Sequence, residues 1–218
     1  MPGLRSIARS FRPIAFARRL LRRWGVAAEQ RTTFSSFRRY LPDLLRWAAP
    51  ARVLEFGPGF SSRLILDNSA ARILSFETHP GYYERARRDI VSPRFELRLA
   101  PAGPDFATLV GERFDFIFVD GGDRVKNLEQ SVELLSEDGI VVLHDAHREG
   151  YEPGVLRYAR GYFIENHSLL LCNNPSRFEQ VKARFPADGS CNCKYCGTPA
   201  RVAYRRRIAE ALGGSARA

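Results

Sequence analysis

The most informative stretch of this 218-residue chain reads Val53-Leu54-Glu55-Phe56-Gly57-Pro58-Gly59-Phe60-Ser61-Ser62. An apolar run meets an acid and then two glycines one residue apart, and a helical pattern follows at once. This order predicts a strand, a tight turn and a helix N-terminus. Turns of this kind bring backbone N–H groups close to a ligand.

A second apolar run, Ile73-Leu74-Ser75-Phe76, ends in Glu77. An acid about 20 residues after a glycine turn can accept both hydroxyls of a ribose. Each motif alone is a weak signal, but the pair predicts a ligand that contains a nucleoside.

From Arg52 onward, apolar runs alternate with helical patterns. The expected strands are 52–56, 72–77, 95–99, 115–120 and 139–144, and the expected helices between them are 61–69, 80–90, 104–111 and 124–136. Such alternation favours an α/β fold in which crossovers join parallel strands. We predict a Rossmann-like, mostly parallel sheet with helices on both faces and a helical N-terminal extension.

The chain divides into three predicted segments: a basic helical extension (1–50), a Rossmann-like cofactor-binding domain (51–175), and a C-terminal elaboration with a cysteine cluster and a basic tail (176–218). In the first segment we expect two short helices within 1–24, separated at Pro13, and a third helix from 34 to 47. After the last predicted strand of the sheet we expect a helix near 153–160 and a hairpin of 162–164 with 168–172.

The net charge of +10 comes from the two ends of the chain. Residues 1–48 hold eleven arginines and two acids, and residues 201–218 hold five arginines and one acid. Segment 1–24 is basic and amphipathic, so it could lie on an anionic membrane, bind nucleic acid, act as an organelle transit peptide or pack against the domain. No apolar run reaches the roughly 18 residues of a membrane-spanning helix. We expect a cytoplasmic protein, with membrane association through residues 1–24 left open.

Polar side chains stand at the ends of four predicted strands, where ligands of parallel sheets bind. These ends read Glu55-Phe56-Gly57, Glu77-Thr78-His79, Asp120-Gly121-Gly122 and His144-Asp145-Ala146-His147. In the order of these motifs, the chain from residue 52 to 147 resembles class I S-adenosylmethionine-dependent methyltransferases, and among them small-molecule O-methyltransferases. The third glycine that is usual in the family's loop is Ser61 here, and a serine can cap the following helix.

The resemblance implies a role for each strand end. Gly57 and Gly59 would admit the methionine part of the cofactor, and Glu55 would anchor it. Glu77 would bind the ribose, and Thr78 and His79 would lie beside the adenine. The full cofactor-binding set is then Glu55, Gly57, Pro58, Gly59, Ser61, Ser62, Glu77, Thr78 and Asp120, with Asp120 facing the sulfonium and methyl group.

The predicted catalytic residues are Asp120, His144 and Asp145, and three interpretations of them stay open. Asp120 and Asp145 could hold a divalent cation such as Mg²⁺, which would lower the pKa of a substrate hydroxyl. Alternatively, His144 or His147 acts as a general base without a metal. In the third interpretation, Asp145 caps the next turn and the histidines are polar residues at the edge of the sheet.

Four cysteines are the remaining candidates for a metal site. Cys191, Cys193 and Cys196 lie within six residues, and Cys172 is the fourth. Four thiolates could complete a structural zinc site, although only Cys193 and Cys196 have the usual C-x₂-C spacing. Reduced thiols are the alternative, because nothing in the sequence signals secretion.

We therefore predict an S-adenosylmethionine-dependent methyltransferase that acts on a hydroxyl oxygen of a small molecule. One alternative is an RNA-modifying methyltransferase whose basic ends bind phosphates. Another is a non-catalytic protein of the same fold that binds a membrane surface or a partner. A nicotinamide dehydrogenase is not favoured, because Ser62 stands where G-x-G-x-x-G requires glycine.

Overall fold

The computed structural model of the chain describes residues 36–189 and 196–213. The helices predicted within 1–24 lie outside the described residues. The same holds for Cys191, Cys193 and the end of the basic tail after residue 213.

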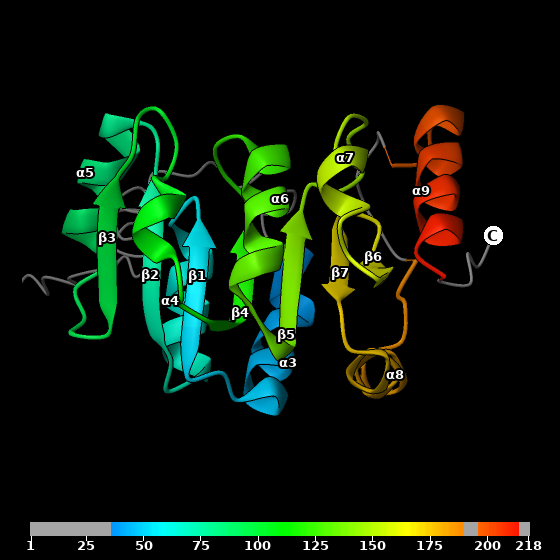
Figure 1. The fold of residues 1–218 in the computed structure, drawn as a ribbon, viewed down its shortest axis with the longest axis horizontal. Helices are drawn as coiled ribbons and strands as arrows, with labels where there is room; N and C mark the ends of the chain where they lie inside the picture. Colours follow the sequence, from blue (N-terminus) through cyan, green and yellow to red (C-terminus); the bar gives the residue numbers. More distant parts are fainter. Residues whose placement is uncertain (1–35, 190–195, 214–218) are drawn as a thin grey trace, which may run out of the picture. The chain divides into compact units, whose positions relative to one another are not determined.

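A seven-stranded sheet forms the centre of the described region, in the order β3-β2-β1-β4-β5-β7-β6 (Figure 1). The strands are β1 (Arg52–Phe56), β2 (Arg72–Glu77), β3 (Phe95–Leu99), β4 (Phe114–Val119), β5 (Leu135–His144), β6 (Arg160–Glu165) and β7 (Ser168–Cys172). Strands β1 to β5 pair in parallel, and β7 runs antiparallel between β5 and β6. The strand order reverses between β1 and β4, and ligands of such sheets bind outside the carboxyl ends of the strands at this switch point.

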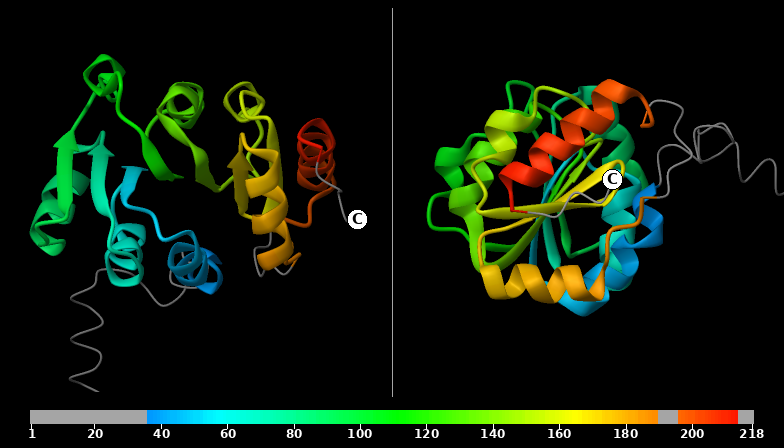
Figure 2. Two further views of the ribbon diagram at one scale, coloured as in Figure 1. Left: turned by 60° about the horizontal axis from the view of Figure 1, so that its bottom comes forward. Right: turned by 90° about the vertical axis from the view of Figure 1, so that its right-hand side faces the viewer.

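Helices cover both faces of the sheet, as both views in Figure 2 show. One face carries α3 (Leu41–Ala48), α4 (Phe60–Asn68), α5 (Pro80–Asp89) and α8 (Pro175–Arg184), and the other carries α6 (Arg124–Leu134), α7 (Glu152–Val155) and α9 (Pro199–Ala211). Two short 3₁₀ helices are η1 (Ser36–Arg39) and η2 (Phe106–Leu109). The predicted α/β fold with a mostly parallel sheet is confirmed.

The central strand β4 shows why the sequence of this sheet is so apolar. Phe116 and Phe118 pack into a buried cluster with α3 on one face, whereas Ile117 and Val119 pack into a second cluster with α6 on the other. All four side chains are fully buried. A strand covered on both faces needs apolar residues at every position, which explains the uninterrupted run that the sequence shows.

Three predicted helices differ most in extent from the observed ones. The helix expected over 34–47 is divided into η1 and α3, because the ring of Pro42 would clash with a backbone carbonyl one turn earlier in a continuous helix. The helix expected over 104–111 is only the short η2. The helix expected near 153–160 ends at Val155, and the hydroxyl of Tyr158 instead donates to the carbonyl oxygen of Leu128 at 3.1 Å.

Helices α8 and α9 are absent from the sequence prediction. Helix α8 begins where the side chain of Asn174 accepts hydrogen bonds from two backbone N–H groups, and it buries Phe178 and Val181. Helix α9 buries Tyr204 and Ile208 among many basic residues. Because each of these helices has few apolar residues, its hydrophobic periodicity is weak and the sequence does not predict it. In the part of the chain that the structure describes, no helix is long and apolar enough to cross a membrane.

Candidate active site

The turns that follow β1 and β4 touch one another at two glycines. Gly57 has a φ of +90°, and a Cβ on it would lie 2.8 Å from the backbone nitrogen of Gly121. The backbone of Gly57 also donates to Phe76 of β2, at 3.0 Å. Because the obstruction is backbone, no side chain fits at either glycine. The ends of β1, β2 and β4 are thereby held together at the switch point of the sheet.

Glu55 supports this turn from beneath. Its carboxylate is fully buried and accepts hydrogen bonds from the hydroxyls of Ser61 at 2.7 Å, Ser62 at 2.6 Å and Ser75 at 3.0 Å. Ser62 in turn accepts a hydrogen bond from the backbone of Gly59. Burial raises the pKa of Glu55 to about 7, although the three hydroxyls act to lower it. The contacts of Ser61 and Ser62 seen here are therefore with Glu55, and a direct contact of either serine with the cofactor stays a prediction.

Glu77 stands at the end of β2 in the position expected of a ribose ligand. It is 8% exposed, and its Oε1 accepts a hydrogen bond from the backbone of His79 at 2.8 Å. His79 caps α5 by accepting from the backbone of Gly81. Thr78 lies beside the turn after β4, with its methyl carbon 3.3 Å from where a Cβ on Gly122 would stand.

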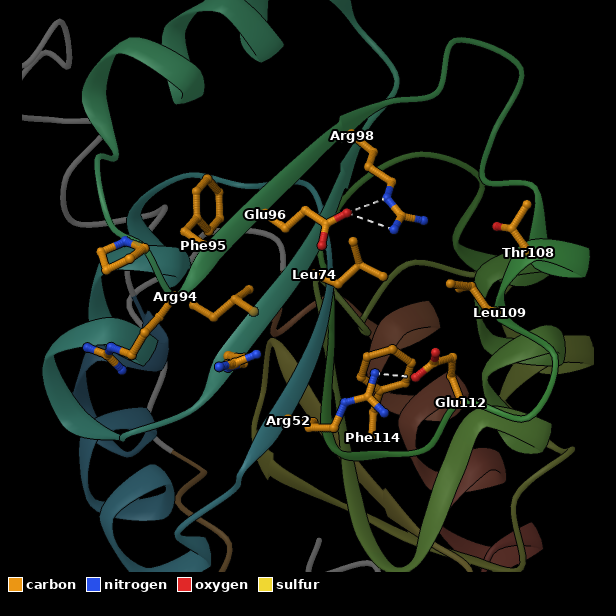
Figure 3. Close-up of a pocket in the computed structure, with 13 residues that line it drawn as sticks. Arg52, Leu74, Arg94, Phe95, Glu96, Arg98, Thr108, Leu109, Glu112 and Phe114 are labelled. Atoms are coloured by element: carbon orange, nitrogen blue, oxygen red, sulfur yellow. Dashed lines mark hydrogen bonds and ion pairs between the residues drawn. The ribbon is translucent and has the colours of Figure 1, made fainter.

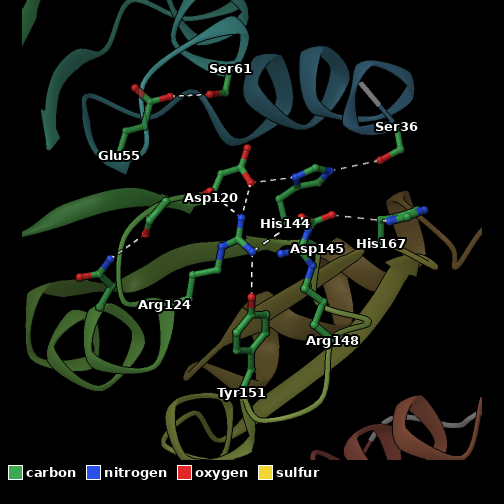
Figure 4. Close-up of polar contacts among 12 residues, drawn as sticks. Ser36, Glu55, Ser61, Asp120, Arg124, His144, Asp145, Arg148, Tyr151 and His167 are labelled. Atoms are coloured by element: carbon green, nitrogen blue, oxygen red, sulfur yellow. Dashed lines mark hydrogen bonds and ion pairs between the residues drawn. The ribbon is translucent and has the colours of Figure 1, made fainter. Parts of the chain in front are cut away.

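Asp120 is the centre of the polar cluster at the ends of β4 and β5, which Figure 4 shows. Its Oδ1 lies 2.8 Å from Nη2 of Arg124 and 2.9 Å from Nδ1 of His144. Arg124 also donates to the backbone oxygen of Asp120 at 2.6 Å and to the hydroxyl of Tyr151 at 2.8 Å. The sequence prediction missed Arg124. Its spacing of four residues from Asp120, in the first turn of α6, was the available signal.

The members of this cluster differ in exposure and in charge. The Asp120 side chain is 27% exposed, whereas the His144 side chain behind it is 3% exposed. Burial acts to lower the pKa of His144, but the hydrogen bond and charge of Asp120 outweigh burial and raise it. For Arg124 too, burial acts to lower the pKa and the charge of Asp120 raises it overall. Asp120 is therefore the carboxylate that a substrate can reach, and Arg124 and His144 hold it in place.

Asp145 completes the cluster from the turn after β5. Its backbone is left-handed, with a φ of +58°, and its Oδ2 lies 2.5 Å from Arg148 and 3.7 Å from Arg124. Burial acts to raise the pKa of Asp145, but the neighbouring cationic and histidine side chains lower it well below its usual range. The guanidinium of Arg124 reaches both Asp120 and Asp145. Ligand atoms of Asp120, His144 and Asp145 lie within 4.8 Å of one another, and Arg124 also supplies positive charge between the two carboxylates. The divalent cation at Asp120 and Asp145 stays a prediction.

His147 lies away from Asp120 and faces His167 instead, with 4.4 Å between the ring centroids. Burial and the neighbouring His167 lower the pKa of His147 to about 3. The two described cysteines, Cys172 and Cys196, lie in different surroundings. Cys172 is fully buried in the apolar cluster on the α3 face, and Cys196 lies 3.3 Å from Nε2 of His167. The four-cysteine zinc site stays a prediction.

A cavity of about 460 Å³ lies at the opposite end of the sheet (Figure 3). Its wall includes Arg52, Arg72 and Phe114, which are at the beginnings of β1, β2 and β4. Two of its arginines are paired with acids, Arg52 with Glu112 and Arg98 with Glu96. The predicted site residues are at the other end of the strands, so this cavity is separate from them.

Comparison with known proteins agrees with the geometry of the strand ends. Residues 54–146 match the family model described as a methyltransferase domain. The predicted class I, S-adenosylmethionine-dependent methyltransferase is thereby confirmed. None of the curated proteins is significantly similar to the chain in sequence.

Solved structures of other methyltransferases share the fold. A methyltransferase from Geobacter sulfurreducens is 19% identical, with a TM-score of 0.51 over 74% of this chain and 88% of that one. The cofactor-bound protein Rv0187 from MTB is 20% identical, with a TM-score of 0.51 over 77% and 93%. A candidate caffeoyl-CoA O-methyltransferase from Staphylococcus aureus is 18% identical, with a TM-score of 0.50 over 65% and 70%. At these identities the likeness establishes the fold of the methyltransferase.

Proposed function

We propose that this methyltransferase transfers the methyl group of S-adenosylmethionine to a hydroxyl oxygen of a small molecule. The observation that carries the proposal is the position of Asp120. It is the more exposed carboxylate of its cluster, it follows β4 directly, and the neighbouring Gly121 contacts the glycine turn. A carboxylate at this point can face both a bound cofactor and an acceptor hydroxyl.

The strand ends fit the cofactor in two places. A Cβ on Gly59 would meet no atom within 4 Å, so there is open space in front of the N-terminus of α4. A helix N-terminus favours a carboxylate such as that of the methionine part. The hydrogen bond from the backbone of His79 fixes the direction of the Glu77 carboxylate, which we assign to the ribose hydroxyls.

When bound, S-adenosylmethionine supplies an electrophilic methyl group on a positively charged sulfur. Asp120 accepts a hydrogen bond from the acceptor hydroxyl and orients its oxygen toward the methyl carbon. The Asp120–His144 pair takes the hydroxyl proton and releases it to solvent, while the oxygen forms a bond to the methyl carbon and the sulfur keeps the bonding electrons. Arg124 holds Asp120 in position. Positioning of this kind supplies much of the rate enhancement.

A small acceptor is supported by the distribution of charge. The basic excess of the sequence lies at its two ends, and residues 49–200 hold fewer basic than acidic residues. A nucleic-acid substrate requires a basic surface beside the site. The description of the Staphylococcus aureus protein as a candidate O-methyltransferase also supports oxygen as the acceptor atom.

The test is S-adenosylmethionine binding by titration calorimetry. The native chain should bind the cofactor, and Glu77→Ala should weaken binding at least about tenfold, because a lost charge-assisted hydrogen bond costs about 1.5–3 kcal/mol. Glu84→Ala is the matched control, because this acid of α5 is exposed and faces Arg87, and it should bind nearly as tightly as the native chain. Absence of binding to the native chain, or equal binding by Glu77→Ala, would overturn this assignment.

A further inference from the structure

A second cluster of polar side chains lies next to Asp145 and takes no part in the mechanism above. It consists of His147, His167 and Cys196, which we call the imidazole–thiol cluster. Each residue offers a metal-binding atom, and these atoms all lie within 4.8 Å of one another. The three residues are 4%, 5% and 2% exposed. The donor atoms of these three side chains are therefore shielded from bulk water.

The fold brings this cluster together from three separate segments. His147 is in the turn after β5, His167 is in the turn between β6 and β7, and Cys196 directly precedes the residues that lead into α9. The backbone of Ala146 donates to the carbonyl oxygen of His167 at 2.8 Å, which joins the first two segments. Arg205 of α9 donates to the carbonyl oxygen of Cys196 at 3.0 Å. The backbone around each of the three residues is thus fixed.

Two ring nitrogens of the cluster are buried without a hydrogen bond. They are Nδ1 of His147 and Nδ1 of His167, while Nε2 of His167 lies 3.3 Å from Sγ of Cys196. Buried polar atoms in folded proteins nearly always have a partner. Nδ1 of His167 faces Asp145 at 3.8 Å, so Nδ1 of His147 is the atom that indicates a ligand.

We propose that His147, His167 and Cys196 bind a zinc ion that fixes the β6–β7 turn and the start of α9 against the turn after β5. Imidazole nitrogen and thiolate sulfur are the donors that zinc prefers, and a buried ion with such donors is structural. The described residues supply three ligands, and a tetrahedral ion takes one more. Neither the cofactor nor the acceptor contributes to this site, so the proposal does not depend on the reaction.

Asp145 connects the imidazole–thiol cluster to the active site. Its Oδ1 lies 3.8 Å from Nδ1 of His167, and its Oδ2 faces Arg148 and Arg124 (Figure 4). A histidine that binds zinc commonly has a carboxylate next to its other ring nitrogen, which orients the ring. Asp145 is in that position, with Nε2 of His167 turned toward Cys196. It serves as a positioning residue for the zinc ligand.

The first experiment measures metal in the full-length chain and needs no variant. The chain is reconstituted with zinc alone under reducing conditions, excess metal is removed, and zinc is determined by mass spectrometry. We expect about one ion per chain, with both imidazole nitrogen and sulfur in its X-ray absorption spectrum. A chain that retains no zinc overturns the proposal. So does a shell of sulfur alone, which would favour a site made only of cysteines.

The second experiment compares matched variants. Cys196→Ala and His167→Ala should each lose the zinc, whereas Cys172→Ala, which removes a buried thiol from the apolar cluster on the α3 face, should retain it. S-adenosylmethionine binding reports whether each variant is folded. A folded Cys196→Ala chain that holds zinc as tightly as the native chain would contradict the proposal. If a variant does not fold, the absorption spectrum of the native chain decides.

Discussion

The active-site cluster around Asp120 and the imidazole–thiol cluster lie side by side, and they use related side chains in opposite ways. Around Asp120, Arg124 and His144 lie 2.8 and 2.9 Å from the carboxylate, which is half-buried. In the imidazole–thiol cluster, Nδ1 of His147 is buried without a hydrogen bond. A carboxylate held by such partners can orient a substrate and take its proton, whereas a buried ring nitrogen without a partner favours a metal ion. The difference shows that hydrogen bonding, more than residue type, distinguishes a catalytic histidine from a metal ligand.

The largest expected effect is on the chemistry at Asp120. Asp120→Asn keeps the shape of the side chain but removes the charge that accepts the proton, so kcat/KM should fall about a thousandfold, within the usual range for general base catalysis. Single-turnover methyl transfer measures the loss once an acceptor is found. Cofactor affinity should change only severalfold. An Asp120→Asn enzyme with near-native turnover would remove Asp120 from the mechanism.

Loss of zinc should act on stability and leave the role of Asp120 unchanged. Removing the metal with a chelator should lower the Tm by about 10 °C, which corresponds to about 3 kcal/mol in a chain of this size. Thermal unfolding with and without zinc measures this shift, and Cys196→Ala should not show it. Asp120→Asn should show the same shift as the native chain. If Asp120→Asn instead abolished the zinc-dependent shift, the two clusters would be one site.

Asp145 contacts both clusters, so a change there should affect each of them moderately. Asn adopts the left-handed conformation of this position readily, so Asp145→Asn tests the charge alone. Zinc affinity should fall about tenfold, as expected for the partner of a metal-binding histidine. The kcat/KM should fall by less. A competition titration with a chromophoric chelator gives the zinc affinity. An effect on turnover alone would place Asp145 only in the active site.

The smallest expected effect is a change in pH dependence. Because Asp120 raises the pKa of His144, the ring keeps its proton to a higher pH than the usual 6.5. The Asp120–His144 pair takes a proton only when that ring is neutral, so kcat/KM should rise with pH through an inflection above 6.5. His144→Gln should remove the inflection, because glutamine can donate to Asp120 but does not titrate. A profile that is unchanged in His144→Gln would exclude His144 as its origin.

The sequence predicted the sheet well because each strand carries its own local signal. Strand β1 was predicted with its observed bounds, and the acids at the strand ends lie together as expected. Helices α8 and α9 were missed, because Phe178 and Tyr204 are isolated apolar residues among polar ones. Local patterns alone could not define these amphipathic faces.

The site was predicted in part. The contacts that the sequence did not predict all depend on tertiary packing. Glu55 was expected to contact the cofactor, but whether a buried carboxylate is already bound by serines depends on tertiary packing. The sequence signal around Cys196 was the C-x₂-C spacing, whereas the structure adds His147 and His167 from distant turns. Spacing along the chain contains no information on such contacts.

Because Gly57 and Gly121 are in contact, the turns after β1 and β4 constrain each other's sequence. A Cβ at either position would collide with the backbone of the other, so no exchange of side chains at these positions can compensate. A change at one cannot be rescued at its partner. Variation that adapts the enzyme to new acceptors must therefore arise elsewhere around the site, while this pair stays glycine.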